Sequence, residues 1–348
     1  QNQMTVTKLW LDGQFVDISG TGYEPVGEFS VNGEIISDLK QFPAARTTLW
    51  VGTINNDAQL EPVGESEGKT TYRMVGDPTE GSILVAALKA GAAANVVNQN
   101  YPRKQEIPFD SARKRMVTIH NIVNPGHGDI SPYVTNEKTN WYTIAVKGAP
   151  DVVLNLCSYR SGMDNTPVPL TPEMRQEILD ANDLMTGKAL RVLGVAYRPV
   201  PEMPNEITAE ALEQDLIFVG LIGMIDPSRP EVKPALKEAQ TAGIRSVMIT
   251  GDYPNTAKAI AEDIGLLRKG HQVLTGADVE HATEEEMREI VKITDVYARV
   301  SPEHKMKIVD ALRVESDPDR AARLMAIGKK LATDIHDIFK LPCGCKCC

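Results

Sequence analysis

The feature that most constrains the fold is a regular alternation of strand-like and helix-like segments between residues 216 and 312. The run IFVGLIGMI, Ile217–Ile225, is apolar throughout, as expected for a buried strand. After a turn, one amphipathic stretch ends at Gly243 and a second ends at Gly265, and glycine commonly follows the end of a helix. The β-rich run IRSVMIT, Ile244–Thr250, lies between these two stretches. This alternation predicts an α/β unit.

The alternation of strand-like and helix-like segments continues towards residue 312. Gln272–Leu274 is a short strand candidate, and Thr283–Glu286 has the spacing of a capping box that begins a helix. Val296–Val300 is the next β-rich run. Ser301-Pro302 then provides an N-cap and a proline at the first position of another predicted helix.

Residues from about 10 to 215 follow a different pattern, which predicts a separate α+β domain. Scattered β-rich runs such as Trp141–Val146 and Ala189–Tyr197 lie among a few helices and polar connections. One helix should begin at Asp77-Pro78, because an Asp cap followed by proline is a typical helix start. Another should begin at Thr171-Pro172 for the same reason.

Composition excludes several classes of protein. The 348 residues carry 37 Lys and Arg against 47 Asp and Glu, a formal net charge of −10, which argues against a nucleic-acid partner. The longest uncharged run of interest, Leu216–Ile225, is far shorter than the roughly 20 apolar residues that span a bilayer. We therefore expect no direct membrane insertion by this chain. No basic and apolar leader opens it at Gln1, and a cytoplasmic location fits best.

The five cysteines do not indicate a disulfide framework. Cys157 stands alone in an apolar stretch, and Cys343, Cys345, Cys347 and Cys348 crowd the last six residues. This usage is typical of a reducing environment. The tail could bind a soft metal through thiolates, or it could be a disordered terminus.

The motif Thr250-Gly251-Asp252 stands where a buried strand ends, the edge at which open α/β sheets bind ligands. A hydroxyl, a glycine and a helix N-terminus make a phosphate cradle, although Asp252 could equally be a helix cap. Arg299 and Lys305 could reach the same edge and neutralise a phosphoryl group. The alternative for Lys305 is a solvated surface lysine.

Two further motifs lie in the predicted α+β domain. Lys147-Gly148 follows a strand and places an ammonium group at its end. The run FDSARKR, Phe109–Arg115, combines an aromatic ring with three cations, which suits stacking on a base and attracting phosphates. Phe109 could instead be a core aromatic, the cations a solvated strand edge, and Glu80 a member of an Asp77-x-x-Glu80 capping box.

Taken together, these segments resemble the cytoplasmic nucleotide-binding and phosphorylation region of a P-type cation-transporting ATPase, most like the calcium-pump branch. The resemblance covers residues 1 to about 312, in the family's order. Its matching stretches are Asn2–Val6, Gly76–Glu80, Phe109–Met116, Lys147–Pro150, Ala189–Arg191, Asp226–Pro230, Met248–Asp252 and Ala298–Pro302.

The resemblance implies a fold and a division of the chain. It implies an α/β, haloacid-dehalogenase-like Rossmann phosphorylation domain, here incomplete, with an inserted α+β nucleotide-binding domain built on an antiparallel sheet. The expected parts are a connection at 1–9, the nucleotide-binding domain at 10–215, the C-terminal part of the phosphorylation domain at 216–312, and a divergent helix with a Cys-rich tail at 313–348.

The resemblance also implies roles for individual residues. Phe109 would stack on adenine, Glu80 would approach the polar edge of the base, and Arg191 would reach the phosphate chain. The residues implied to bind nucleotide in this domain are Glu80, Phe109, Ser111, Lys114, Lys147, Gly148 and Arg191. Those implied at the phosphate end are Asp226, Arg229, Thr250, Gly251, Asp252 and Arg299. The candidate catalytic residues are Thr250, Asp252 and Lys305.

The expected cofactors are ATP and the Mg²⁺ that the nucleotide carries, and no metal site is predicted in the protein. The family's phosphorylated segment Asp-Lys-Thr-Gly-Thr and its Gly-Asp-Gly-x-Asn-Asp loop are not found in the sequence. We therefore expect nucleotide binding without a phosphoenzyme or transport, and a parent protein joined to membrane helices and an actuator domain. A helix at Arg320–Phe339 would cover sheet edges that are otherwise exposed.

Two other functions stay open. A free-standing phosphohydrolase of the haloacid-dehalogenase type would use Thr250 and Lys305, and it would release phosphate from small esters. A non-catalytic interaction module would bind a partner or metal through its terminal segment, and it would show no saturable ATP binding.

Overall fold

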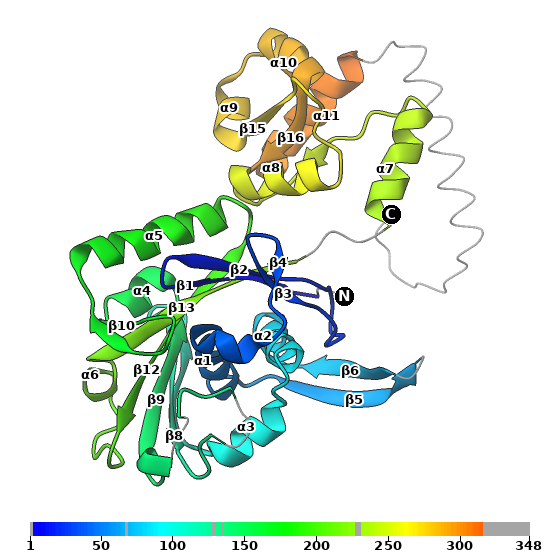
Figure 1. Ribbon diagram of the computed structural model, residues 1–348. Coiled ribbons are helices and arrows are strands. Elements are labelled where there is room, and N and C mark those ends of the chain that lie inside the picture. The colour runs from blue at the N-terminus through cyan, green and yellow to red at the C-terminus, as the bar shows by residue number, and fades with distance from the viewer. Residues whose placement is uncertain (1–2, 67–68, 127–129, 134–135, 227–230, 316–348) are drawn as a thin grey trace, which may run out of the picture. The chain divides into compact units, whose positions relative to one another are not determined.

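The computed structural model describes residues 3–66, 69–126, 130–133, 136–226 and 231–315. It is a mixed α/β protein with two compact units, Gln1–Ser228 and Arg229–Cys348 (Figure 1). Arg229, the expected helix at Arg320–Phe339 and the tail cysteines lie outside the described residues.

The first unit is built on one large, mainly antiparallel sheet with the central order β4-β3-β2-β1-β13-β12-β9-β8-β7. Strand β10 joins it by pairing in parallel with β13, and β11 pairs with β10. The strands are β1 (Thr5–Leu11), β2 (Gln14–Ile18), β3 (Phe29–Val31), β4 (Glu34–Ile35), β7 (Arg103–Asp110), β8 (Arg115–Asn121), β9 (Tyr142–Gly148), β10 (Cys157–Ser161), β11 (Pro167–Pro169), β12 (Arg191–Val200) and β13 (Leu216–Ile225).

The predicted strand at 217–225 is confirmed as β13, but it belongs to this large sheet. It pairs with β1 and β12 on its two sides, so segments from the two ends of the unit lie next to each other. Both faces of the sheet are covered by helices, which explains why nearly every residue of β13 is buried and apolar. Strand β13 therefore belongs to the first compact unit.

One face of the sheet is covered by α1 (Pro43–Ile54), α2 (Pro78–Lys89) and α3 (Ala94–Asn100). The other is covered by α4 (Pro150–Leu154), α5 (Pro172–Thr186) and α6 (Ala209–Leu212). A separate hairpin of β5 (Gln59–Ser66) and β6 (Lys69–Val75) extends from the α2 side (Figure 1). Short 3₁₀ turns occur at Leu39–Gln41, Asn136–Lys138 and Val291–Ile293.

Local helix signals are confirmed. The Asp77 side chain accepts a hydrogen bond from the Thr79 N–H at the start of α2, and Thr171 caps α5 in the same way. Within the described ranges no single helix is long and apolar enough to cross a bilayer. Helices α2 and α3 meet that test only as a pair, and they are bent by 89° where they join.

The second unit has a parallel sheet of order β14-β16-β15 with helices on both faces. Its elements are β14 (Met248–Ile249), β15 (Gln272–Thr275), β16 (Thr294–Ala298), α7 (Val232–Thr241), α8 (Pro254–Asp263), α9 (Gly276–His281), α10 (Glu284–Ile290) and α11 (Pro302–Glu315). Helices α7 and α8 share one apolar core, and α9 to α11 share another. The predicted capping box at Thr283–Glu286 is present at the start of α10.

The strand expected at Ile244–Thr250 is shorter in the structure, where β14 spans two residues. Among the described residues, β14 hydrogen-bonds to β16 alone. A strand paired on one side has fewer ladder hydrogen bonds to define its length, so the apolar run of the sequence overestimates it.

Candidate functional site

A cavity of about 550 Å³ lies in the first unit, where β7, β8, β9 and β12 meet the start of α2. It brings together many of the residues predicted for nucleotide binding in this domain. Its lining consists of Asp57, Gly76, Asp77, Thr79, Glu80, Phe109, Met116, Lys147, Gly148, Arg191 and Leu193.

Phe109 lines this cavity with an exposed ring, because 64% of the residue is accessible to solvent. It lies in a β-bulge: Ile107 pairs with Val117 and Asp110 pairs with Arg115, so one extra residue stands on β7. Bulges change the direction of a side chain relative to a regular ladder. Phe109 is therefore a surface aromatic beside a cavity and not part of the core.

Lys147 and Glu80 meet at the same cavity. Lys147, on β9, is 5% exposed, and its Nζ donates to Glu80 Oε1 at 2.7 Å and to the Asn55 carbonyl at 2.5 Å. Burial lowers the pKa of Lys147, and the charge and hydrogen bond of Glu80 act against this effect. The other oxygen of Glu80 accepts the Asp57 N–H at 2.9 Å. Glu80 is thus committed to these partners rather than to a capping box with Asp77.

Arg191 and Gly148 complete the predicted set. The Arg191 guanidinium is exposed and donates to Thr79 Oγ1 at 2.8 Å, which places a cation at the margin of the cavity. A Cβ at Gly148 would collide with the Lys114 carbonyl and with Arg115. Glycine is needed there because β8 and β9 approach closely beside the cavity.

Ser111 and Lys114 lie elsewhere, in the turn between β7 and β8, where both are exposed and neither lines the cavity. The Asp110 carboxylate organises this turn by accepting the N–H groups of Ala112 and Arg113. Lys114 has a positive φ of 55° at the end of the turn. Its backbone carbonyl, and not its side chain, faces the start of α4 by accepting the Ala149 N–H.

Other lining residues were not singled out from the sequence, and Asp57 is the clearest case. Its carboxylate accepts from Arg103 Nη1 at 2.6 Å, and Arg103 also donates to the Asn56 carbonyl at 2.7 Å. Arg103 thereby fastens the loop after α1 to β7. No local pattern connects Asp57 with residues that lie far away in the sequence. Met116 and Leu193 add apolar surface to the cavity.

In the second unit, Thr250, Gly251, Asp252 and Arg299 lie together at the carboxyl end of β14 and β16. Thr250 Oγ1 donates to Asp252 Oδ2 at 2.7 Å, and the Arg299 N–H donates to the Asp252 carbonyl at 3.0 Å. The Arg299 guanidinium stacks on the Tyr253 ring at 3.7 Å from its centroid. Tyr253 is the N-cap of α8, so the alternative of Asp252 as the cap is wrong.

The remaining predicted residues are more dispersed. Lys305 is exposed on the first turns of α11. Asp226 is exposed directly after β13 in the first unit. Burial of the Tyr23 hydroxyl raises its pKa, and the negative charge of Asp226 raises this pKa further.

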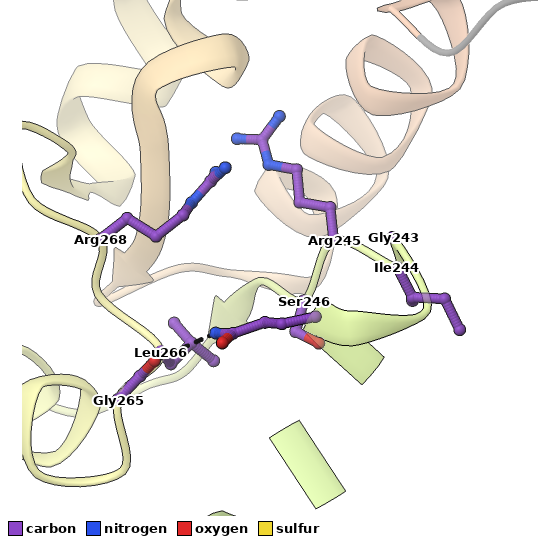
Figure 2. A pocket seen from close by; sticks show the side chains of 8 residues that line it. Gly243, Ile244, Arg245, Ser246, Gly265, Leu266 and Arg268 are labelled. Atoms are coloured by element: carbon purple, nitrogen blue, oxygen red, sulfur yellow. Dashed lines mark hydrogen bonds between the residues drawn. The ribbon is translucent and has the colours of Figure 1, made fainter. Parts of the chain in front are cut away.

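A second cavity, of about 450 Å³, lies at the opposite end of the small sheet. Figure 2 shows the side chains of Arg245 and Arg268 converging beside it. Arg268 Nη2 donates to the buried Asp295 at 2.5 Å, and Arg245 donates to the Thr294 carbonyl at 3.0 Å. Burial would raise the pKa of Asp295, but the hydrogen bonds from Arg268 hold it below its usual value. These contacts fasten the amino ends of the strands, whereas ligands of such sheets bind at the carboxyl ends.

The part of the chain that the structure describes contains no group of three or more His, Cys, Asp or Glu side chains that could hold a metal ion. Of the carboxylates that line the first cavity, Glu80 pairs with Lys147, Asp57 pairs with Arg103, and Asp77 caps α2.

Two family models match parts of the chain. The family model of P-type ATPase cytoplasmic domain N matches residues 45–231, and that of haloacid dehalogenase-like hydrolases matches residues 150–335. A calcium-transporting ATPase of Bacillus subtilis is 41% identical over 89% of the chain and 32% of its own length. Calcium-transporting ATPase 1 of Lactococcus lactis is 41% identical over 70% of the chain and 26% of its own length.

A probable cation-transporting ATPase F of Mycobacterium tuberculosis is 33% identical over 90% of the chain. The chain spans about a quarter to a third of the length of these relatives. The resemblance inferred from the sequence motifs is confirmed, since the matched domain N covers more than half of the 348 residues. The chain belongs to the P-type ATPases and contains their cytoplasmic domain N.

Proposed function

We propose that the cavity of the first unit binds the adenine end of ATP. The observation that carries the proposal is the meeting of an exposed aromatic ring, Phe109, with the buried Lys147 and its ion-pair partner Glu80 in one cavity of about 550 Å³. Pockets for small ligands typically have a volume of roughly 300–1,000 Å³. Stacking of a base on an aromatic ring contributes about 1–3 kcal/mol.

The carboxylates of the cavity can accept a hydrogen bond from adenine. The carboxylates of Glu80 and Asp57 can only accept hydrogen bonds when ionised. The exocyclic amino group of adenine is a donor and would find acceptors in these carboxylates.

The charges of the cavity indicate that the base, more than the phosphates, would supply the affinity. Asp57, Asp77 and Glu80 line it together with two cations, Lys147 and Arg191. Lys147 is already paired, so Arg191 is the group most able to meet a phosphate. Mg²⁺ would then be held chiefly by the phosphate oxygens of the nucleotide.

We further propose that the chain is the cytoplasmic nucleotide-binding region of an ATP-driven cation pump, with calcium or a related cation as the transported ion. The names of the relatives in Bacillus subtilis and Lactococcus lactis support calcium. In this proposal Thr250, Asp252 and Lys305 serve the phosphoryl group at the second unit.

A titration with a fluorescent ATP analogue tests the binding proposal. The wild type should bind saturably, and Phe109→Ala should weaken binding about tenfold, the effect of losing one stacking contact. Leu184→Ala is the matched control, because Leu184 is 59% exposed on α5 and does not line the cavity. Equal affinities of Phe109→Ala and Leu184→Ala would contradict the assignment of the site.

A further inference from the structure

Glu213 is a nearly buried carboxylate outside the cavity that binds Arg113, in the turn after Phe109, and Arg115, at the start of β8. It follows α6 as the C-cap residue, and its side chain is 3% exposed. Arg113 Nη2 donates to its Oε1, and Arg115 donates to its Oε2 from Nη2 at 2.5 Å and from Nε at 2.9 Å. No sequence motif indicated this cluster.

The carboxylate stands on a well-fixed segment. The Glu213 N–H donates to the Ala209 carbonyl at 2.8 Å, and the neighbouring Leu212 is fully buried. A few residues later the chain enters β13, in the middle of the large sheet. Glu213 therefore connects the β7–β8 turn to the most constrained part of the unit.

The part of the hairpin that Glu213 holds is the part that directs Phe109. Arg115 is the ladder partner of Asp110, directly after the bulge that contains Phe109. Inside the bulge no regular pairing fixes the backbone, so the direction of the ring depends on how its two ends are held. The end at Ile107 is held by Val117, and the end at Asp110 is held through Arg115 and Glu213.

We propose that Glu213 is a positioning residue for nucleotide binding, which holds the β7–β8 turn so that Phe109 presents its ring to the cavity. The inference rests on the proposed function. The same carboxylate pairs with both guanidinium groups, which leaves Arg113 and Arg115 less able to act as phosphate ligands. Two close cations without this carboxylate would repel each other and displace the turn.

A double-mutant cycle between Glu213 and Phe109 tests the inference, with ATP affinity measured by calorimetry. Glu213→Gln should weaken ATP binding about fivefold, the size of coupling usual between residues that share a structural unit. In the Phe109→Ala background the same substitution should cause no further loss. Binding of inorganic triphosphate, which has no base, should be unchanged by Glu213→Gln. The control is Glu177→Gln on α5, which removes one of the two carboxylate partners of Arg160 and should bind ATP like the wild type.

The outcomes separate the two proposals. The positioning role is overturned if Glu213→Gln binds ATP with wild-type affinity. It is also overturned if Glu213→Gln lowers the ATP affinity by the same factor in the wild-type and Phe109→Ala backgrounds. Both results leave the adenine site intact. Absence of ATP binding by the wild type overturns both. If Glu213→Gln does not fold, Arg113→Gln removes one link of the same cluster at a side chain that is 25% exposed, and it is judged by the same criteria.

Discussion

Lys147 Nζ lies 2.7 Å from Glu80 Oε1 at the cavity of the first unit, although β9 and α2 supply these residues from distant parts of the chain. The pair joins the sheet to the start of the helix that flanks the cavity. Its two charges would lose most of their hydration here without each other. The contact therefore contributes both to the stability of the unit and to the shape of the candidate site.

Removing one member of this pair should destabilise the first unit. Lys147→Met leaves the Glu80 carboxylate without its buried partner, and breaking a buried pair in this way costs about 3 kcal/mol. Urea unfolding followed by tryptophan fluorescence measures the loss, because all three tryptophans, Trp10, Trp50 and Trp141, lie in this unit. The double variant Lys147→Met/Glu80→Gln should be more stable than Lys147→Met alone. A double variant that shows the sum of the two single losses would contradict the pairing.

Because His120 is buried, we expect the first unit to lose stability at acidic pH. Burial lowers the pKa of His120 from 6.5 to about 4, so the folded protein keeps the ring neutral where the unfolded chain binds a proton. Stability should fall as the pH drops from 6.5 towards 4, by at most about 3 kcal/mol from this group. Urea unfolding at pH 7 and pH 4.5 measures the change. His120→Gln cannot take up this proton and should lose less stability between the two pH values, whereas equal losses would exclude His120 as the cause.

The balance of charges at the cavity predicts that the phosphates of a nucleotide add little to its binding affinity. Adenosine, AMP, ADP and ATP should bind the chain with dissociation constants within about one order of magnitude, because each extra phosphate gains mainly the exposed Arg191. Raising the salt concentration should weaken ATP binding only modestly. Competition against a fluorescent ATP analogue gives the four constants. An increase in affinity of a hundredfold or more from adenosine to ATP would show that cations not assigned here dominate binding.

Gly148 should tolerate no side chain. A methyl group in Gly148→Ala would push β9 away from Lys114 and Arg115, and it would disturb both the turn and the cavity. We expect a loss of stability of about 1–3 kcal/mol, typical of overpacking, together with weaker ATP binding. Thermal unfolding and calorimetry measure the two effects. A variant with the melting temperature and affinity of the wild type would show that this close approach is not required.

The sequence predicts best those features that are decided within a few residues. The caps at Asp77, Thr171 and Thr283 depend on one helical turn each, and all three form in the structure. The family motifs predict that Phe109 and Lys147 lie near each other, because each motif corresponds to a fixed place in the family's fold. Both residues line one cavity in the structure.

The features that the sequence does not predict depend on pairing between distant segments. Arg113 and Arg115 look like phosphate ligands until Glu213, about a hundred residues later in the chain, is seen to bind both. The membership of β13 in the large sheet likewise depends on β1 and not on the strands that follow it. Charge and hydrophobicity along a chain show that a group needs a partner, but they do not identify which one.

Hydrogen exchange with and without adenosine tests the central claim most directly, because it locates the bound base without any substitution. Amide exchange should slow at residues 76–81, 107–110 and 145–149, which surround the cavity, and stay unchanged in α5 at Pro172–Thr186. Slower exchange confined to other parts of the first unit, or no change at saturating adenosine, would contradict the assignment of this cavity as the adenine site.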